Sequence, residues 1–347
     1  MKNNFKKNGK MAVRFETAAE RREIIRILEE QRGFQIEDKL KQSDQIHPYD
    51  TRTFLINLKY RTYTYWIEPF IGAAMMSNGM RLYSAQEFFR IAELGFRKVP
   101  RYPVFHIPHT GERFPFEMLP SVCVPEEEFR RYHALMSDTD VWRFVPRDYY
   151  GGDMTERFTV SRLMCDVERF TGPEEEMEQY GMGFCYEKAF DGKQIKIVTE
   201  ELKAQARKYY DEHHARMDML CERHPRILLF DLHSFSADTL PEHIRERARG
   251  IPDVCIGMDL KYTPHELVGR IERRLDEVNL SHEINTPYSG TFVPNAVWKG
   301  NSSCDLVSVM LEFNKRLYLD ENGMADEVKA KLIRDLMLRI VCDCVDL

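Results

Sequence analysis

Arg226-Ile-Leu-Leu-Phe-Asp-Leu-His233 is the stretch of sequence that decides the fold of this chain. Apolar residues fill it as far as Phe230, and two titratable residues stand at its end. A short apolar run of this kind is typical of a buried strand. Two other runs end in the same way: Pro103-Val-Phe-His-Ile107, which is followed by His109, and Val307-Ser-Val-Met-Leu-Glu312. Ligands of open α/β sheets bind beyond the carboxyl ends of the strands, so we expect these polar groups to converge.

Helical patterns alternate with these runs from Val99 onward, which indicates an α/β fold. Thr199 caps one predicted helix that reaches His224, and the last predicted helix covers about 325–341. Before Val99 the pattern differs, with strand-like runs at 53–58 and 60–66. We therefore expect a small α+β extension over residues 1–98 and an α/β catalytic domain over 99–347.

The composition excludes several classes of protein. The chain has 347 residues, of which 43% are hydrophobic and 31% charged, and its formal net charge is -6. This balance supports a packed core and argues against a nucleic-acid-binding protein. No apolar run approaches the length of about 18 residues that a membrane helix needs. Eight scattered cysteines without an export signal indicate reduced thiols in a cytoplasmic protein.

The polar residues at the predicted strand ends suggest a metal site. His109 and Glu112 are three residues apart, and His233 could complete a two-histidine, one-carboxylate zinc site with an open position for water. Taken singly, each histidine could equally be a satisfied polar residue, and Glu112 could be a solvated loop charge. Glu312 follows an apolar run, where it is either a general base or the partner of Arg316 in an ion pair.

Two arginines flank an otherwise apolar segment. Arg162 and Arg169 carry the planar guanidinium that suits a substrate carboxylate or a carbonyl oxygen. The alternative for Arg162 is an ion pair with Asp166, four residues further along.

Several motifs occur in the order found in one known family. They are Ile107-Pro-His-Thr-Gly111, Ser137-Asp-Thr-Asp140, Ser161-Arg162 with Asp166 and Arg169, Asp231-Leu-His-Ser234, and Leu311-Glu312. From about Val99 to its end the chain resembles the N-formylglutamate amidohydrolase family, which is similar in fold to zinc carboxypeptidases. The resemblance implies a mixed central sheet flanked by helices. It also implies zinc on His109, Glu112 and His233, with Asp138 or Asp140 as alternative carboxylate ligands.

The resemblance also implies a reaction, which is zinc-dependent hydrolysis of an N-formyl or N-acyl amide of an acidic amino acid. Glu312 would be the base, and Arg162 would stabilise the oxyanion. Arg169 and Arg316 would hold the small-molecule substrate by its carboxylate, and His214 would orient a ligand. Two alternatives compete with this reading: a non-catalytic binding protein that uses the aromatic run at 60–66, and a carboxypeptidase-like deacylase acting on another amide.

Overall fold

The computed structural model describes residues 100–240 and 250–347 without interruption. Before residue 100 it describes the segments 10–15, 17–28, 35–36, 53–57, 62–66, 82–86 and 88–89. The chain divides into two compact units, residues 1–101 with Asp346 and residues 102–345 with Leu347. Within the described part of the chain, none of the helices is long and apolar enough to cross a membrane.

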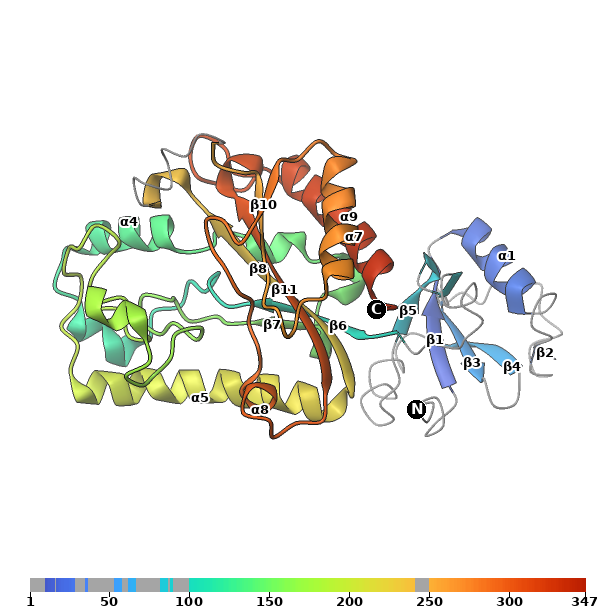
Figure 1. Cartoon of the computed structure of the whole chain (residues 1–347), viewed down its shortest axis with the longest axis horizontal. Coiled ribbons are helices and arrows are strands. Elements are labelled where there is room, and N and C mark those ends of the chain that lie inside the picture. The colour runs from blue at the N-terminus through green and yellow to red at the C-terminus, as the bar shows by residue number, and fades with distance from the viewer. Residues whose placement is uncertain are drawn as a thin grey trace. The chain divides into compact units, whose positions relative to one another are not determined.

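The larger unit is built around a six-stranded sheet with the strand order β10-β9-β11-β8-β6-β7 (Figure 1). Its strands β6, β7, β8 and β11 are mutually parallel, and β9 runs antiparallel to β11. The mixed α/β sheet predicted from the sequence is therefore confirmed. The strands are β6 (Tyr102–Ile107), β7 (Thr155–Arg157), β8 (Arg226–Phe235), β9 (Val254–Gly257), β10 (His282–Ile284) and β11 (Asp305–Asn314).

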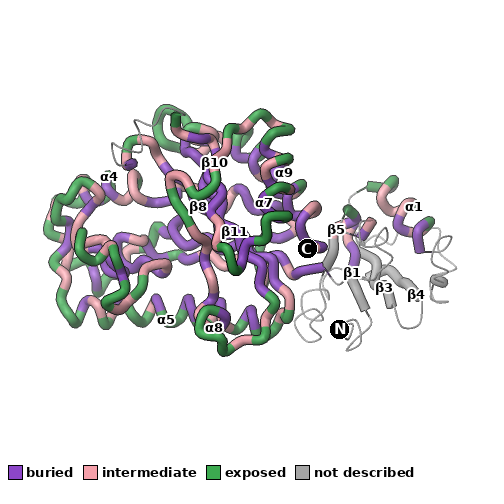
Figure 2. Tube along the Cα trace, viewed as in Figure 1, coloured by how far each residue is buried: buried purple, intermediate pink, exposed green. Residues whose placement is uncertain are grey.

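Helices cover both faces of this sheet. One face packs against α7 (His265–Asp276) and α9 (Glu327–Cys344), and the other packs against α5 (Glu200–Arg223) (Figure 1). Thr199 caps α5, as the sequence predicted. Helix α4 (Glu126–Met136) follows β6 in the chain, and the short helix α8 (Asn295–Trp298) precedes β11. The strands and the inner sides of the helices form the buried centre of the unit (Figure 2).

Alternation along the central strands explains where the polar groups lie. Leu228, Phe230 and Leu232 of β8 face α7 and α9, whereas Ile227 and Leu229 pack with α5. The α5 face of β8 then continues with Asp231 and His233, because side chains of a strand alternate between its two faces. An apolar side chain buried at such a position would contribute about 1.5–3 kcal/mol, so polar groups here suggest function rather than stability.

The described parts of the first unit form a second sheet with the order β2-β4-β3-β1-β5. Its strands are β1 (Lys10–Arg14), β2 (Gln35–Ile36), β3 (Thr53–Asn57), β4 (Thr62–Trp66) and β5 (Leu82–Ser84), with α1 at Ala18–Arg26. Thr17 and Glu20 form a capping box at the start of α1, which is why the helix begins there. The two strand-like runs of the sequence correspond to β3 and β4.

Candidate active site

The ends of β8 and β11 bring the central residues of the site together. The two strands are parallel, and Glu312 lies in register with His233. Residues paired in a parallel sheet point to the same face, so the two side chains are neighbours. Both are buried, with exposed fractions of 7% for Glu312 and 3% for His233.

Two histidines and one aspartate form a triangle of possible metal ligands. The Nδ1 atoms of His109 and His233 are 3.2 Å apart. Asp138 Oδ2 lies 3.0 Å from His233 Nδ1 and 3.7 Å from His109 Nδ1. Donors on a tetrahedral zinc ion at 2.0–2.1 Å are about 3.4 Å apart, so this triangle has the size of one face of such a site.

The other side of the His109 ring is held by a carboxylate. Its Nε2 lies 2.9 Å from Asp166 Oδ1. A ring that donates from Nε2 to Asp166 is free to offer the lone pair of Nδ1 to a metal, and carboxylate support of this kind is common behind metal-binding histidines. Asp166 is itself fixed, because Arg162 donates to its Oδ2 from Nη2 at 2.8 Å and Tyr186 donates from its hydroxyl at 3.1 Å.

Asp138 reaches the triangle because the end of α4 is fixed. Lys315 lies just beyond β11, and its Nζ donates to the carbonyls of Ser137 at 2.7 Å and Leu135 at 3.2 Å. The backbone N–H of Asp138 donates to the carbonyl of His109 at 2.9 Å. These bonds tie the loop after α4 to His109, which follows β6, and to the end of β11, the strand that carries Glu312.

Electrostatics distinguish the carboxyl groups of the site. Burial raises the pKa of Glu312 to about 8, and Asp138 adds to this shift while His233 opposes it. Burial also opposes ionisation of Asp138, but hydrogen bonds with His109 and His233 outweigh it and lower the pKa of that carboxyl. Near neutral pH, Asp138 is therefore an anion suited to a cation, and Glu312 is poised to exchange a proton.

Burial and nearby carboxylates also shift the pKa values of His109 and His233. Burial alone would lower the pKa of both rings. Asp166 and Glu168 outweigh it for His109, and Glu168 and Asp231 outweigh it for His233. Both pKa values are therefore raised, and the metal-free site balances its carboxylates with protons on the rings.

Glu168 approaches from the opposite side of the rings. Its carboxylate oxygens lie 3.4 Å from His109 Nε2 and 3.4 Å from His233 Nε2. Glu168 thus takes part in two further groups of three possible ligand atoms, one with His109 and His233 and one with His106 and Asp231. The charges of Asp138 and of both histidines also act on the carboxyl of Glu312.

Three predicted site residues are not brought to the histidines. Glu112 is exposed, as is Arg113 next to it, which forms an isolated bridge with Val160. Asp140 accepts a hydrogen bond from Trp142 Nε1 at 3.0 Å instead. Arg316 is 55% exposed and pairs with Asp253 at 2.9 Å rather than with Glu312.

The remaining predicted residues surround the site. Arg162 forms the ion pair with Asp166 that the sequence offered as an alternative. Arg169 is about one-third exposed, and its Nε has no hydrogen-bond partner and lies 3.8 Å from Asp166 Oδ2. His214 Nε2 donates to the carbonyl of Val167 at 2.8 Å, so it supports the loop that carries Asp166. Burial lowers the pKa of His214 to about 3, which keeps its ring neutral.

Sequence reasoning missed Glu168, His106 and His213. His106 lies within an apolar strand and pairs in register with Asp231 on β8, which the sequence alone does not indicate. The spacing of Asp166 and Glu168, two residues apart, was a weak signal that both point the same way. His213 lies on α5 and is brought to the sheet only by tertiary packing.

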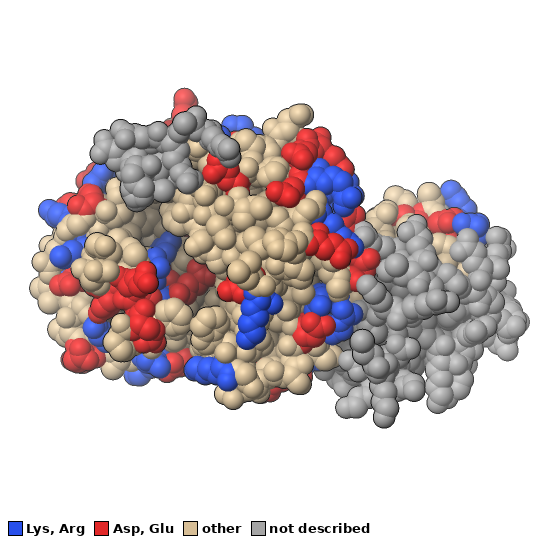
Figure 3. Space-filling view, viewed as in Figure 1, with Lys and Arg blue, Asp and Glu red and all other residues tan. Residues whose placement is uncertain are grey.

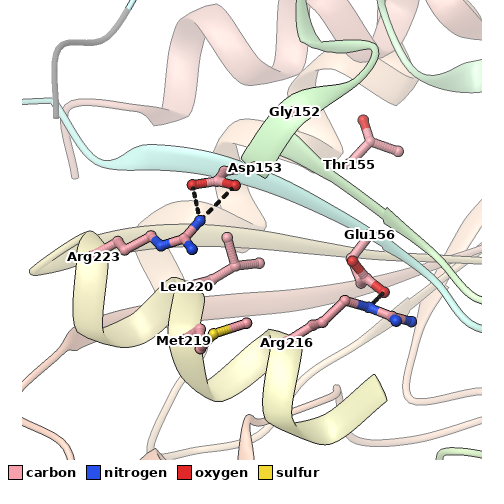
Figure 4. A pocket seen from close by; sticks show the side chains of 8 residues that line it. All are labelled: Gly152, Asp153, Thr155, Glu156, Arg216, Met219, Leu220 and Arg223. Carbon is pink, nitrogen blue, oxygen red and sulfur yellow. Dashed lines mark hydrogen bonds and ion pairs between the residues drawn. The ribbon is translucent and has the colours of Figure 1, made fainter. Parts of the chain in front are cut away.

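A separate pocket lies where β7 meets α5 (Figure 4). Its charged side chains are paired with one another, Arg216 with Glu156 at 2.7 Å and Arg223 with Asp153 at 3.0 Å.

The molecular surface also has a hollow, with basic side chains inside it and acidic ones gathered along its edge (Figure 3).

Comparison with known proteins bears on this site. A family profile described as N-formylglutamate amidohydrolase matches residues 103–319. A solved structure of N-formylglutamate amidohydrolase from Ralstonia eutropha JMP134 is similar, with a TM-score of 0.57 and 22% sequence identity, covering 72% of this chain and 95% of that one. The gene product Atu2144 of Agrobacterium tumefaciens has a TM-score of 0.48 and 16% identity, covering 70% and 91%. No curated protein matches the chain.

Proposed function

Because the chain belongs to the N-formylglutamate amidohydrolase family, we propose that it hydrolyses the amide of an N-formyl or N-acyl amino acid, with an acidic amino acid as its product. We assign this activity to residues 99–347. The observation that carries the proposal is the position of Glu312, a buried carboxyl with a raised pKa, in register with His233 and close to Asp138. Such a group near metal-binding side chains suits a general base.

We assign the metal to the Nδ1 atoms of His109 and His233 and to a carboxylate oxygen of Asp138. Two imidazoles and one carboxylate form a donor set that zinc favours in catalytic sites, and the spacing of the three atoms supports this choice. A bound zinc ion would polarise the amide carbonyl and lower the pKa of a water molecule toward about 7. Asp166 would keep the His109 ring in the tautomer that offers Nδ1.

Glu312 moves the proton in this mechanism. In its ionised form, which a bound cation beside it would favour, Glu312 takes a proton from water as the water oxygen attacks the carbonyl carbon of the amide. It then delivers that proton to the amide nitrogen as the C–N bond breaks, which yields formate or another carboxylate and the free amine. Burial of Glu312 keeps bulk water from competing for the proton.

Arg169 is our choice for holding the carboxylate of the substrate. Its side chain is partly exposed, and its buried Nε, which has no hydrogen-bond partner, faces Asp166 at 3.8 Å, so the exposed end of the guanidinium is the part open to a substrate. An arginine can bind a carboxylate through two parallel hydrogen bonds, which favours an acyl-amino acid over an uncharged amide. We assign Arg162 to the support of Asp166 rather than to the oxyanion, because its donors are already used by Asp166, Tyr186 and Met136.

The experiment is a panel assay with the full, zinc-loaded chain. Formate or amine release is measured from N-formylglutamate, N-formylaspartate, N-acetylglutamate, N-formylleucine and a dipeptide ending in glutamate. We expect turnover of the N-acylated acidic amino acids, reduced about 10²–10⁴-fold by Glu312→Gln. The matched control Glu321→Gln alters an exposed glutamate and should retain full activity.

Two outcomes would contradict this proposal. Preferred cleavage of the dipeptide would favour a carboxypeptidase-like deacylase. A folded, zinc-loaded chain that releases neither formate nor amine from any of the compounds would favour a binding protein.

A further inference from the structure

A line of buried polar side chains leads from His233 away from the proposed reaction centre. His233 Nε2 lies 3.0 Å from Asp231 Oδ1, and the same oxygen lies 2.8 Å from His106 Nδ1. His106 Nε2 is 2.9 Å from Nε2 of His213 on α5. His106 and His213 are fully buried, and Asp231 is 1% exposed.

This line ends at the pocket of Figure 4. His213 Nδ1 lies 3.5 Å from Glu156 Oε1, and Arg216 donates to the same oxygen from Nε at 2.7 Å. Burial lowers the pKa of His213 to about 4, despite the opposing effect of Glu156. His213 is therefore a neutral ring that contributes one ring nitrogen to His106.

Burying a polar ring such as that of His213 costs free energy, which suggests that the ring has a function. His213 lies between the helix and the sheet, where an apolar residue would pack without any need for a hydrogen-bond partner. Its ring contacts Phe158 and Phe292, so an aromatic residue would fit the space. The shortest polar contact of the ring is the one that its Nε2 makes with His106, at 2.9 Å, whereas Nδ1 lies 3.5 Å from Glu156.

We propose that His213 is a positioning residue for the metal ligand His233, acting through His106 and Asp231. Asp231 is fixed at its second oxygen, because Oδ2 accepts the backbone N–H of Phe292 at 3.0 Å. Its first oxygen is shared by His106 and His233. His106 can hold that oxygen only in one ring orientation, and the contact with His213 at the other end of the ring fixes that orientation.

The two proposed histidine ligands are then supported in parallel ways. Asp166 backs His109 and is anchored by Arg162. Asp231 backs His233, and among the described residues its ion-pair partners are the histidines His106 and His233. Loss of His213 would leave His106 Nε2 buried without a partner and allow its ring to turn away from Asp231.

The test measures metal affinity, and it rests on the metal site proposed above. The full chain is stripped with a chelator and titrated with Zn²⁺ by calorimetry, with stability followed by urea unfolding. We expect His213→Phe, which keeps an aromatic ring, to weaken zinc binding about 10–100-fold. His213→Gln returns a polar group near the position of Nε2 and should recover a large part of the affinity.

Met217→Ala is the matched control. Met217 is a buried residue of α5 one turn from His213, and its truncation should lower the urea midpoint of unfolding without weakening zinc binding. If His213→Phe leaves zinc affinity unchanged, or if Met217→Ala weakens it as much, the positioning role is wrong. If wild type binds two zinc ions and the His213 variants lose one completely, the line is itself a cation site and the proposal is also wrong.

The same titration separates this inference from the proposed function. Wild-type protein that binds no zinc at all contradicts the metal site itself. Zinc binding that resists His213→Phe contradicts only the role of His213. Should His213→Phe fail to fold, His213→Gln is compared with Asp231→Asn: we expect Asp231→Asn to weaken zinc binding more, and equal wild-type affinity in both would overturn the proposal.

Discussion

Replacement of Glu312 by glutamine should make the stability of the metal-free protein less dependent on pH. Glu312 is buried, and its pKa is raised from 4.5 to about 8. Below pH 4.5 the carboxyl is neutral in both folded and unfolded chains, so it has no effect on the free energy of unfolding. Between pH 4.5 and 8 the unfolded chain ionises and the folded chain stays protonated, which progressively destabilises the fold.

The size of the effect follows from that shift. One pKa unit corresponds to 1.36 kcal/mol, so between pH 5 and pH 9 the wild-type protein should lose up to about 4 kcal/mol relative to Glu312→Gln. Above pH 8 the difference should level off, because both states are then ionised. A neutral glutamine of nearly the same shape removes this dependence while it retains the packing.

The assay is urea unfolding of the chelator-treated full chain at pH 5, 7 and 9. We expect the stability advantage of Glu312→Gln to grow with pH, and the control Glu321→Gln to track the wild-type protein. A constant difference between Glu312→Gln and wild type at the three pH values would refute the argument that burial raises the pKa of Glu312.

Three further predictions concern the metal and the substrate. Zinc binding near pH 6 should release protons, because the pKa values of His109 and His233 are raised in the metal-free protein and a metal needs both rings neutral; calorimetry in buffers of different ionisation enthalpy measures this, and zero release would contradict it. Asp138→Asn should weaken zinc binding at least about 10²-fold while Glu112→Gln leaves it unchanged, and the reverse order in a zinc titration would identify the wrong carboxylate. Arg169→Gln should raise KM for N-formylglutamate at least about 10-fold but change KM little for an amide without a carboxylate, whereas equal effects on both would exclude binding of the substrate carboxylate.

The strands and several residues at their ends could be predicted from the sequence. Residues 227–230 are apolar, and the two polar residues that follow them, Asp231 and His233, are two apart, so they share one face of a strand. The same pattern indicated Glu312 on a neighbouring strand. These predictions succeeded because they depend only on local alternation and on the rule that strand ends gather at one edge of a sheet.

The carboxylate of the triangle could not be predicted in this way. A spacing of three residues favoured Glu112, but its side chain is exposed, whereas His109 is buried. Asp138 is brought in by the end of α4, which Lys315 holds from 178 residues away. A contact over that distance leaves no local pattern in the sequence.

Arg316 and His213 also show that distance along the chain does not predict which residues lie near the site. Arg316 follows Glu312 closely, yet the turn after β11 directs it toward Asp253 at the surface. His213 is far from every strand in sequence, yet packing of α5 on the sheet brings it within 2.9 Å of His106. Which polar residue reaches the site is decided by tertiary packing rather than by distance along the chain.

The most direct test of the central claim is zinc-dependent release of formate. The full chain is stripped with a chelator, zinc is restored in steps, and formate release from N-formylglutamate is measured against the zinc bound. The account predicts no turnover without metal, turnover that rises with bound zinc, and loss of turnover in Glu312→Gln at equal zinc content. A folded, zinc-loaded wild-type chain that releases no formate, or a Glu312→Gln chain as active as the wild type, would contradict it.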